Sequence, residues 1–417
     1  MKKGSAFIFA FLFFSTVLFS QNIAYVRGVI DTLSSPGFYG RGYVNNGDRI
    51  AAEFIVKQLK KDKLKFFTPD ALQPFHLNVN TFPGTLELKI NGILKTPGTD
   101  YLVMPDAPSM NHKYKTLLLN EKTLSTPKLI HKFEKRKVSG LSLVADTGFK
   151  DLKNKKLQES PLLLKISEKL PAWHVADAQN SNKHAEIIIN RNALPEKIKK
   201  VSVKVEAIQQ DNYQTQNVVG YISGKVCPDS FVVFGAHYDH LGIMGSKAYF
   251  PGASDNGSGT AMLLDLAAYY SQPENQPDYS MVFIFFSGEE AGLLGSEYYT
   301  SHPLFPLSKI KFMLNLDMVG TGSEGIKVVN GSVFKTLFQK LKELNEKGGY
   351  VKTVSERGEA ANSDHYFFYK HGVKCFFIYT LGNEDKEYHT VGDKADILPL
   401  TKYPELFHLI CDFIKIL

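Results

Sequence analysis

Two adjacent glutamates, Glu289 and Glu290, separate an apolar run from a helical pattern in the stretch FFSGEEAGLLGSEYY, residues 285–299. Two carboxylates side by side repel each other and give nothing to folding. A bound cation would offset this repulsion. Because successive side chains diverge, one carboxylate can bind a metal ion while the other reaches a water molecule on that ion. The pair therefore predicts a metal site whose other ligands lie elsewhere in the chain.

The other candidate ligands follow apolar runs or occupy turns in the second half of the chain. His237 and Asp239 come after the run SFVVF, and Asp317 closes the run FMLNL. Asp255 stands in the glycine-rich stretch GASDNGSGT, and His389 stands in the loop EYHTVGD. Taken singly, Asp255 could cap a helix, His237 could be a buried core histidine and Asp317 could end a strand. Their coincidence favours one shared site.

The set of side chains suits two metal ions better than one. A catalytic zinc ion usually takes three protein ligands and a water molecule, whereas two histidines and three carboxylates suit two ions about 3.5–4 Å apart with one bridging carboxylate. Two divalent ions, three carboxylates and one hydroxide also give a neutral cluster. The cysteines Cys227, Cys375 and Cys411 fit no zinc–cysteine motif. The expected metal ligands are His237, Asp255, Glu290, Asp317 and His389.

Two further carboxylates have expected roles beside the metal ions. Asp239 is placed to accept the second ring proton of His237, which fixes the tautomer of that ligand. Glu289 is the expected general base, which takes a proton from a water molecule whose pKa the metal ions lower. His240 is a rival ligand, but the position of His237 at the end of a strand favours His237.

Short apolar strands that alternate with helices must position these residues. From about residue 201, the runs SFVVFGAH, YSMVFIFFSG, KFMLNLDMVG and VKCFFIYTLG predict buried strands, and GTAMLLDLAAYY and GLLGSEYYTS predict helices. This alternation is typical of an α/β fold, with a mainly parallel central sheet flanked by helices. Ligands of such sheets bind at the carboxyl ends of the strands, where the candidate residues stand.

The first half of the chain predicts a helix, several strands and a separate small module. DRIAAEFIVKQLKKDKL has the period of an amphipathic helix, and HLNVNTF and TLELKI alternate like strands. Residues 111–200 carry 19 Lys and Arg against 9 Asp and Glu, while the whole chain has a net charge of +7. This shift in charge suggests an inserted domain of small mixed or β-rich structure. The expected units are 21–97 and 201–417 for the catalytic domain and 98–200 for the insertion.

The basic insertion does not indicate a nucleic-acid partner. A basic surface could attract an acidic polymer, but the aromatic residues among the lysines are too few to form a platform that stacks on bases. A solvated lysine-rich face is the simpler interpretation.

The first twenty residues, MKKGSAFIFAFLFFSTVLFS, have the pattern of a secretory signal peptide. The apolar run is shorter than the roughly 20 residues that span a bilayer, although an uncleaved anchor is the alternative. No later stretch is apolar for long enough to cross a membrane. We therefore expect residues 1–20 to be removed and the protein to be exported to the periplasm or outside the cell, without stable membrane insertion.

The motifs GAHYDH, GASDNGSGT, FFSGEEAGLLGSEYY, NLDMVG and YHTVGDKADIL resemble, in the same order, those of the two-zinc exopeptidases. That family includes secreted aminopeptidases, glutamate carboxypeptidase and, as a divergent branch, glutaminyl cyclase. The resemblance covers residues 206–417, and FYGRGY is similar to the N-terminal segment of the family. It implies two zinc ions per chain, one held by His237 and Asp317 and the other by Glu290 and His389, with Asp255 between them.

The resemblance also implies roles for residues that do not bind zinc. Glu289 would be the base, and Asp239 would support His237. Tyr388 matches a tyrosine that stabilises the oxyanion in some members, although a loop tyrosine beside a ligand can simply pack. The insertion is similar to the protease-associated domain of many members.

The expected activity is that of an exported two-zinc aminopeptidase, which hydrolyses N-terminal residues from peptide substrates. Three alternatives stay open from the sequence: cyclisation of N-terminal glutamine by acyl transfer, carboxypeptidase or dipeptidase activity on the same scaffold, and a catalytically inactive binding protein. The pattern GTGSEG, residues 320–325, does not indicate a dinucleotide site, because the following IKVVN predicts a strand where a helix is required. The preferred side chain and the oligomeric state are not determined by these motifs.

Overall fold

The computed structural model describes residues 21–119, 127–146, 155–180 and 183–417 of the 417-residue chain. The expected signal peptide, residues 1–20, lies outside the described residues, so its cleavage stays a prediction. In the described part of the chain, no helix is long and apolar enough to cross a membrane.

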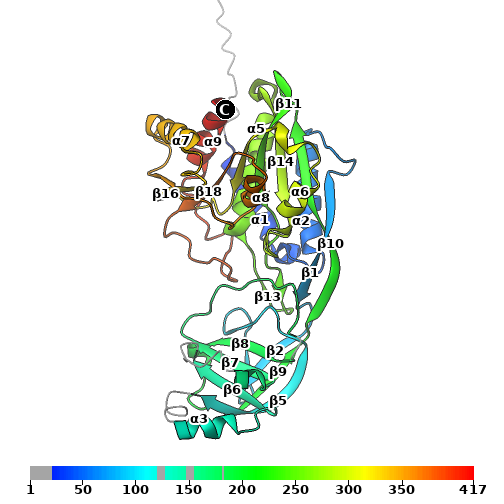
Figure 1. Ribbon diagram of the computed structural model, residues 1–417, viewed down its shortest axis with the longest axis vertical. Coiled ribbons are helices and arrows are strands. Elements are labelled where there is room, and N and C mark those ends of the chain that lie inside the picture. The colour runs from blue at the N-terminus through cyan, green and yellow to red at the C-terminus, as the bar shows by residue number, and fades with distance from the viewer. Residues whose placement is uncertain (1–20, 120–126, 147–154, 181–182) are drawn as a thin grey trace, which may run out of the picture.

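The larger of the two parts visible in Figure 1 is built on a mixed sheet with a parallel centre. Among the described residues, eight strands lie in the order β1-β10-β14-β11-β15-β18-β16-β17. The four central strands β14, β11, β15 and β18 run parallel. Strand β1 pairs antiparallel with β10, β10 with β14, and β16 with β18, whereas β16 and β17 are parallel. The expected α/β fold is confirmed. The strands are β1 (Leu72–Thr81), β10 (Ile208–Ile222), β14 (Tyr279–Phe286), β11 (Cys227–His237), β15 (Ile310–Leu316), β18 (Cys375–Leu381), β16 (Gly325–Val329) and β17 (Val354–Glu356).

Helices cover both faces of this sheet, which explains why its central strands are apolar throughout. On β14, Phe283 belongs to the buried cluster that includes residues of α1, α2, α5, α7 and α9, while its neighbour Ile284 belongs to the cluster that includes residues of α6 and α8. The helix expected from DRIAAEFIVKQLKKDKL is confirmed as α2, which buries Ile55 and Leu59. The helices are α1 (Ile23–Leu33), α2 (Gly47–Lys61), α5 (Gly259–Tyr270), α6 (Leu294–Ser301), α7 (Lys335–Gly348), α8 (His365–Lys370) and α9 (Tyr403–Lys415).

A second mixed sheet forms the other part, at the lower end of Figure 1. Its described strands lie in the order β3-β2-β9-β5-β6-β7-β8-β4. The helices α3 (Pro127–Glu134) and α4 (Lys155–Gln158) belong to the same stretch of chain. The strands are β2 (Leu86–Ile90), β3 (Ile93–Lys95), β4 (Tyr101–Val103), β5 (Met110–Leu119), β6 (Leu141–Asp146), β7 (Leu162–Ser167), β8 (Ala185–Asn190) and β9 (Lys200–Val205).

The strands of the second sheet extend beyond the range 98–200 that the sequence suggested for the insertion. Strands β2 and β3 precede residue 98. Strand β9, which ends at Val205, extends beyond residue 200 and pairs with β2 and β5. The alternating run VSVKV, residues 201–205, stands at the start of the range 201–417 that was expected for the catalytic domain, but it forms β9 and lies in the second sheet. The division of the chain into domains stays a prediction, whereas the structure shows which strands belong to each sheet.

The two sheets share contacts through the loop that follows β11. This loop contains the short strands β12 (Ile243–Met244) and β13 (Ala248–Tyr249). Met244 and Phe250 lie in the same buried cluster as the core of the second sheet. All three cysteines are free, and Cys375 is buried in the core, as the sequence suggested.

Candidate active site

The parallel centre of the first sheet brings the candidate residues to one edge. Strand β11 ends at His237, and β14 ends at Phe286, shortly before Glu289 and Glu290. Strand β15 ends directly before Asp317, and the loop after β18 carries His389. Because the carboxyl ends of parallel strands meet at the same edge, residues far apart in the sequence converge there.

Asp255 stands between two groups of side chains and contacts both. Its Oδ1 lies 3.3 Å from Nε2 of His237, and its Oδ2 lies 2.9 Å from Nε2 of His389. Nε2 of His237 also lies 3.4 Å from Oδ1 of Asp317, and Nε2 of His389 lies 3.2 Å from Oε2 of Glu290. The structure therefore brings all five expected metal ligands together, with one oxygen of Asp255 turned towards each group.

The carboxylates of this cluster favour positive charge at its centre. Burial lowers the pKa of His389, but Glu290 and Asp255 outweigh burial and raise that pKa to about 11. Burial likewise opposes the charge of His237, whose pKa the surrounding carboxylates raise well above its ordinary value. The carboxylates thus favour a positive charge beside both imidazoles. Imidazole and carboxylate donors fit zinc, so the residues present fit the implied metal.

Glu289 lies beside this cluster, in reach of a common centre with His237 and Glu290. Burial raises the pKa of Glu289 well above its ordinary value, and the carboxylates of Glu290 and Asp317 raise it further, against the opposing effect of His237. Gly295 allows α6 to approach the turn that carries Glu289, because a Cβ atom at this position would lie 2.0 Å from the carbonyl oxygen of Ser287. The second glycine of the stretch GLLGS is therefore required by the close approach of α6 to this turn.

Comparison with known proteins agrees with this geometry. Residues 217–414 match the family model described as peptidase family M28. This segment belongs to peptidase family M28. The match confirms the resemblance suggested by the motifs.

Two curated relatives of the M28 segment are named as aminopeptidases. A probable leucine aminopeptidase from Arthroderma otae is 32% identical over 217 residues, which cover 50% of this chain and 59% of that relative. Aminopeptidase YwaD from Bacillus subtilis is 31% identical over 211 residues, which cover 48% of this chain and 43% of that relative. The chain thus spans about half the length of these curated relatives.

The fold likeness extends beyond the M28 segment to nearly the whole chain. A solved structure of a zinc aminopeptidase from Bacillus subtilis has a TM-score of 0.68 and 21% sequence identity, and the match covers 93% of this chain and 94% of that one. The second sheet is therefore part of an arrangement that this solved structure shares.

Asp239 holds the turn of the M28 segment that carries the two glutamates. Its carboxylate accepts hydrogen bonds from the backbone N–H groups of Glu289 and Glu290, both at 3.3 Å, and from the hydroxyl of Tyr43 at 2.6 Å. Nδ1 of His237 lies 3.2 Å from the backbone carbonyl of Asp239 and 3.7 Å from its carboxylate. The closer acceptor for the imidazole is thus the carbonyl, not the expected carboxylate, because the carboxylate is turned towards the glutamate turn.

His240, the rival ligand, belongs to the group around Glu290. Its Nδ1 lies 2.7 Å from Oε1 of Glu290, and the ring is fully buried. Its Nε2 has no hydrogen-bond partner among the described residues. His240 can therefore orient Glu290, whereas His237 has the contacts expected of the strand-end ligand.

Tyr388 precedes His389 and lies at the open side of the site. Its ring stacks on the imidazole of His389 with a centroid distance of 3.8 Å, and 47% of the residue is exposed. The side chain is thus about half exposed beside an expected metal ligand. Its role as an oxyanion donor stays a prediction.

Several residues that support the site were not assigned a role from the sequence. Ser363 donates a hydrogen bond to Oδ2 of Asp317 at 2.8 Å, and Asp393 accepts hydrogen bonds from the backbone of Ser254 and Asp255. The motif SDHYFF, which contains Ser363, was visible in the sequence without indicating its partner. Supporting residues of this kind are Arg41, Tyr43, Trp173, Ser363 and Asp393.

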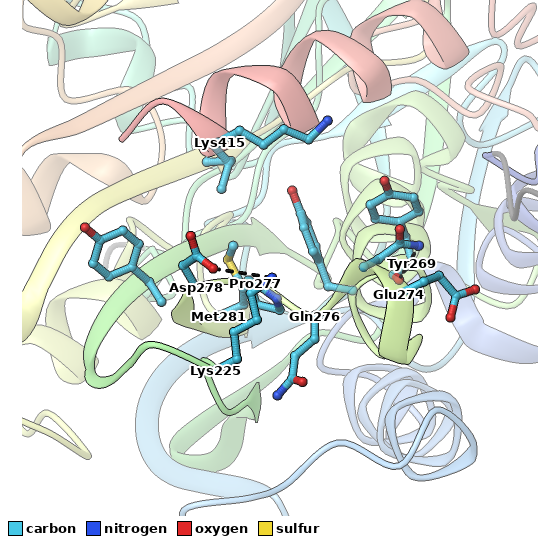
Figure 2. A pocket seen from close by; sticks show the side chains of 12 residues that line it. Lys225, Tyr269, Glu274, Gln276, Pro277, Asp278, Met281 and Lys415 are labelled. Atoms are coloured by element: carbon cyan, nitrogen blue, oxygen red, sulfur yellow. Dashed lines mark hydrogen bonds and ion pairs between the residues drawn. The ribbon is translucent and has the colours of Figure 1, made fainter.

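A separate cavity of about 390 Å³ lies at the end of the first sheet where β14 begins (Figure 2). It is lined by residues at the start of β14 and the ends of α5 and α9, among them Tyr269, Asp278 and Lys415. Lys225 and Asp278 form an ion pair of 3.4 Å across it. None of the candidate site residues lines this cavity, so it has no part in the chemistry described above.

Proposed function

We propose that the protein is a zinc-dependent aminopeptidase that removes N-terminal residues from peptides. The observation that carries this proposal is the position of Asp255, which turns one carboxylate oxygen to His237 and the other to His389. A carboxylate placed in this way suits a pair of metal ions. The names of the relatives, which are aminopeptidases, support the choice of reaction.

Two zinc ions per chain are part of the proposal. His237 and Asp317 would hold one ion, and Glu290 and His389 would hold the other, with Asp255 shared between them. When bound, such ions supply a polarised peptide carbonyl and a water molecule of lowered pKa. His240 keeps Glu290 turned towards its group through the contact of 2.7 Å.

The chain's own contribution to the reaction centres on Glu289. Its carboxylate would take a proton from the attacking water molecule and pass this proton to the leaving amine. Burial favours the protonated form of Glu289, so the side chain can retain the proton between these two steps. Asp239 fixes the backbone of Glu289 through the hydrogen bond of 3.3 Å. The hydroxyl of Tyr388 would donate a hydrogen bond to the developing oxyanion.

The proposal includes export and a role for the second sheet. Residues 1–20 would direct the chain to the periplasm or the extracellular space, where peptides are the substrates. The second sheet would form a protease-associated-like domain beside the site.

Substitution of Glu289 tests the proposed reaction. Glu289→Gln keeps the size of the side chain but removes the base, so turnover of aminoacyl p-nitroanilides should fall by about 10²–10⁴-fold, while two zinc ions remain bound. Glu297→Gln, at an exposed position on α6, is the matched control and should keep full turnover. Unchanged turnover of Glu289→Gln would refute the assigned role.

The choice of substrates separates the alternative reactions. Wild-type enzyme should release the first amino acid from peptides with free amino groups and lose this activity in chelator. With a peptide that begins with glutamine, release of ammonia without shortening of the peptide would show cyclisation instead. Release of the last residue from peptides with blocked amino groups would show carboxypeptidase activity.

A further inference from the structure

One ligand of the candidate metal centre is held by a residue from outside the first sheet. Trp173 lies in the connection between β7 and β8 of the second sheet. Its backbone N–H donates to the carbonyl of His389 at 3.1 Å, and its carbonyl lies 2.7 Å from Nδ1 of His389. Both backbone groups of Trp173 therefore pair with the same histidine.

This pairing decides which ring nitrogen of His389 faces the metal site. A carbonyl can only accept a hydrogen bond, so Nδ1 must carry the proton. Nε2, which faces Asp255 and Glu290, is then the nitrogen that can bind a metal ion. Partners of this type orient the imidazole ligand and raise its basicity.

The backbone of His389 also needs support from its surroundings. Its φ angle is +56°, in the left-handed region that costs a non-glycine residue about 1 kcal/mol or more. Such a conformation persists only where neighbouring contacts fix it. The two hydrogen bonds with Trp173 are contacts of this kind.

The side chain of Trp173 anchors the segment between the two sheets. Its indole N–H donates to the carbonyl of Val103 on β4 at 2.8 Å. Its ring stacks on Phe250, in the loop that follows β11, with a centroid distance of 4.7 Å and an interplanar angle of 11°. Only 5% of Trp173 is exposed. The side chain of Trp173 thus contacts both parts of the protein.

The imidazole of His237, the other histidine among the expected metal ligands, pairs within its own segment. Nδ1 of His237 lies 3.2 Å from the carbonyl of Asp239, two residues further along the same segment. The two histidines are therefore oriented by different parts of the chain, and this difference provides an internal control.

We propose that Trp173 is a positioning residue for the metal ligand His389, so that the second sheet sets the affinity of one of the two metal positions. The inference rests on the proposed metal centre. It predicts that loosening Trp173 weakens the zinc ion held by Glu290 and His389 and spares the ion held by His237 and Asp317.

Three variants separate positioning from general destabilisation. Trp173→Ala removes both the stacking on Phe250 and the indole hydrogen bond, whereas Trp173→Phe keeps an aromatic ring against Phe250. Tyr114→Ala is the control, because Tyr114 is an aromatic residue in the core of the second sheet whose ring contacts His112 on the same strand, β5, rather than a residue of the site. Thermal unfolding of each variant shows how far the second sheet is destabilised.

The first measurement is zinc affinity by competition with a chelator. Trp173→Ala should raise the dissociation constant of one zinc ion by about 10–100-fold and leave the other within about threefold. Trp173→Phe should show a smaller rise, and Tyr114→Ala should bind both ions like the wild type. If Trp173→Ala binds both ions with wild-type affinity, or if Tyr114→Ala weakens the same ion equally, the proposal is overturned.

The second measurement uses the cobalt-substituted protein and the exchangeable imidazole N–H protons in its NMR spectrum. The N–H of His389 should exchange faster with water in Trp173→Ala, while the N–H of His237 should keep its wild-type rate. Equal rates in wild type and variant would contradict the proposal. A wild-type chain that binds two zinc ions but releases no amino acid contradicts the proposed function alone, and the zinc affinities of the variants still decide the role of Trp173.

Discussion

Replacement of Arg41 by lysine should destabilise the protein strongly and disturb the loop that carries Asp255. Arg41 is fully buried, and its guanidinium donates five hydrogen bonds to backbone carbonyl oxygens. Nε donates to Tyr238 at 2.7 Å, directly after the end of β11, and Nη2 donates to Asp255 at 3.1 Å. The remaining acceptors are Leu33, Pro251 and Gly252.

The size of the effect follows from the number of donors. An arginine has five N–H groups in a planar fork, whereas a lysine has three on one atom. The carbonyl of Gly252 also accepts from the N–H of Gly257, so at least one of the other four buried carbonyls would lose its partner in Arg41→Lys. An unsatisfied buried acceptor costs about 1–3 kcal/mol, so the free energy of unfolding should fall by at least that amount.

Urea unfolding in the presence of chelator measures this loss without a contribution from bound metal. Arg49→Lys, at an exposed position of α2, is the control and should change the free energy of unfolding by less than about 0.5 kcal/mol. The folded fraction of Arg41→Lys should also bind zinc more weakly, because Asp255 is less well held. A loss of stability below about 1 kcal/mol would refute the reasoning, since it would mean that the five hydrogen bonds are not needed to satisfy these carbonyls.

Two other substitutions test buried polar groups. Burial raises the pKa of Asp265 to about 7, so the folded state binds this proton more tightly than the unfolded state, and stability from this group falls as pH rises from about 4 to 7. Asp265→Asn should therefore be more stable than the wild type at pH 8, by at most about 4 kcal/mol, and little different at pH 4; equal pH profiles of the unfolding midpoint would contradict this. Ser363→Ala removes the hydrogen bond to Asp317 and should weaken zinc binding by about 10–100-fold, as measured by competition with a chelator. Ser363→Thr, which keeps a hydroxyl, should recover most of the zinc affinity. Wild-type zinc affinity in Ser363→Ala would contradict this prediction.

The elements that position the site were predictable because their signals are local. The runs before His237, Glu289 and Asp317 are apolar on both faces, and the structure confirms them as β11, β14 and β15. The strand β10 was not predicted, because its first half, IQQDNYQTQ, is polar and mostly exposed or half-buried. Its place between β1 and β14 depends on pairing with distant strands, which no local pattern shows.

The boundary between the two sheets was equally hidden in the sequence. Strand β9 alternates like any half-buried strand, and this pattern does not tell which sheet it joins. Its partners β2 and β5 decide this, and they lie on both sides of the boundary expected at residue 98. The charge of residues 111–200 indicated the second unit but not its edges.

The sequence by itself determined the kinds of ligand and the ends of strands at which most of them stand, because residue type and hydrophobic period are properties of short segments. Tertiary structure alone decided how these ligands are held. His389 and Trp173 are 216 residues apart in the chain, and the carbonyl of Asp239 rather than its carboxylate is the nearer acceptor for His237. Hydrogen-bond partners of this kind follow from the distances between folded segments, so they cannot be deduced from the order of the residues.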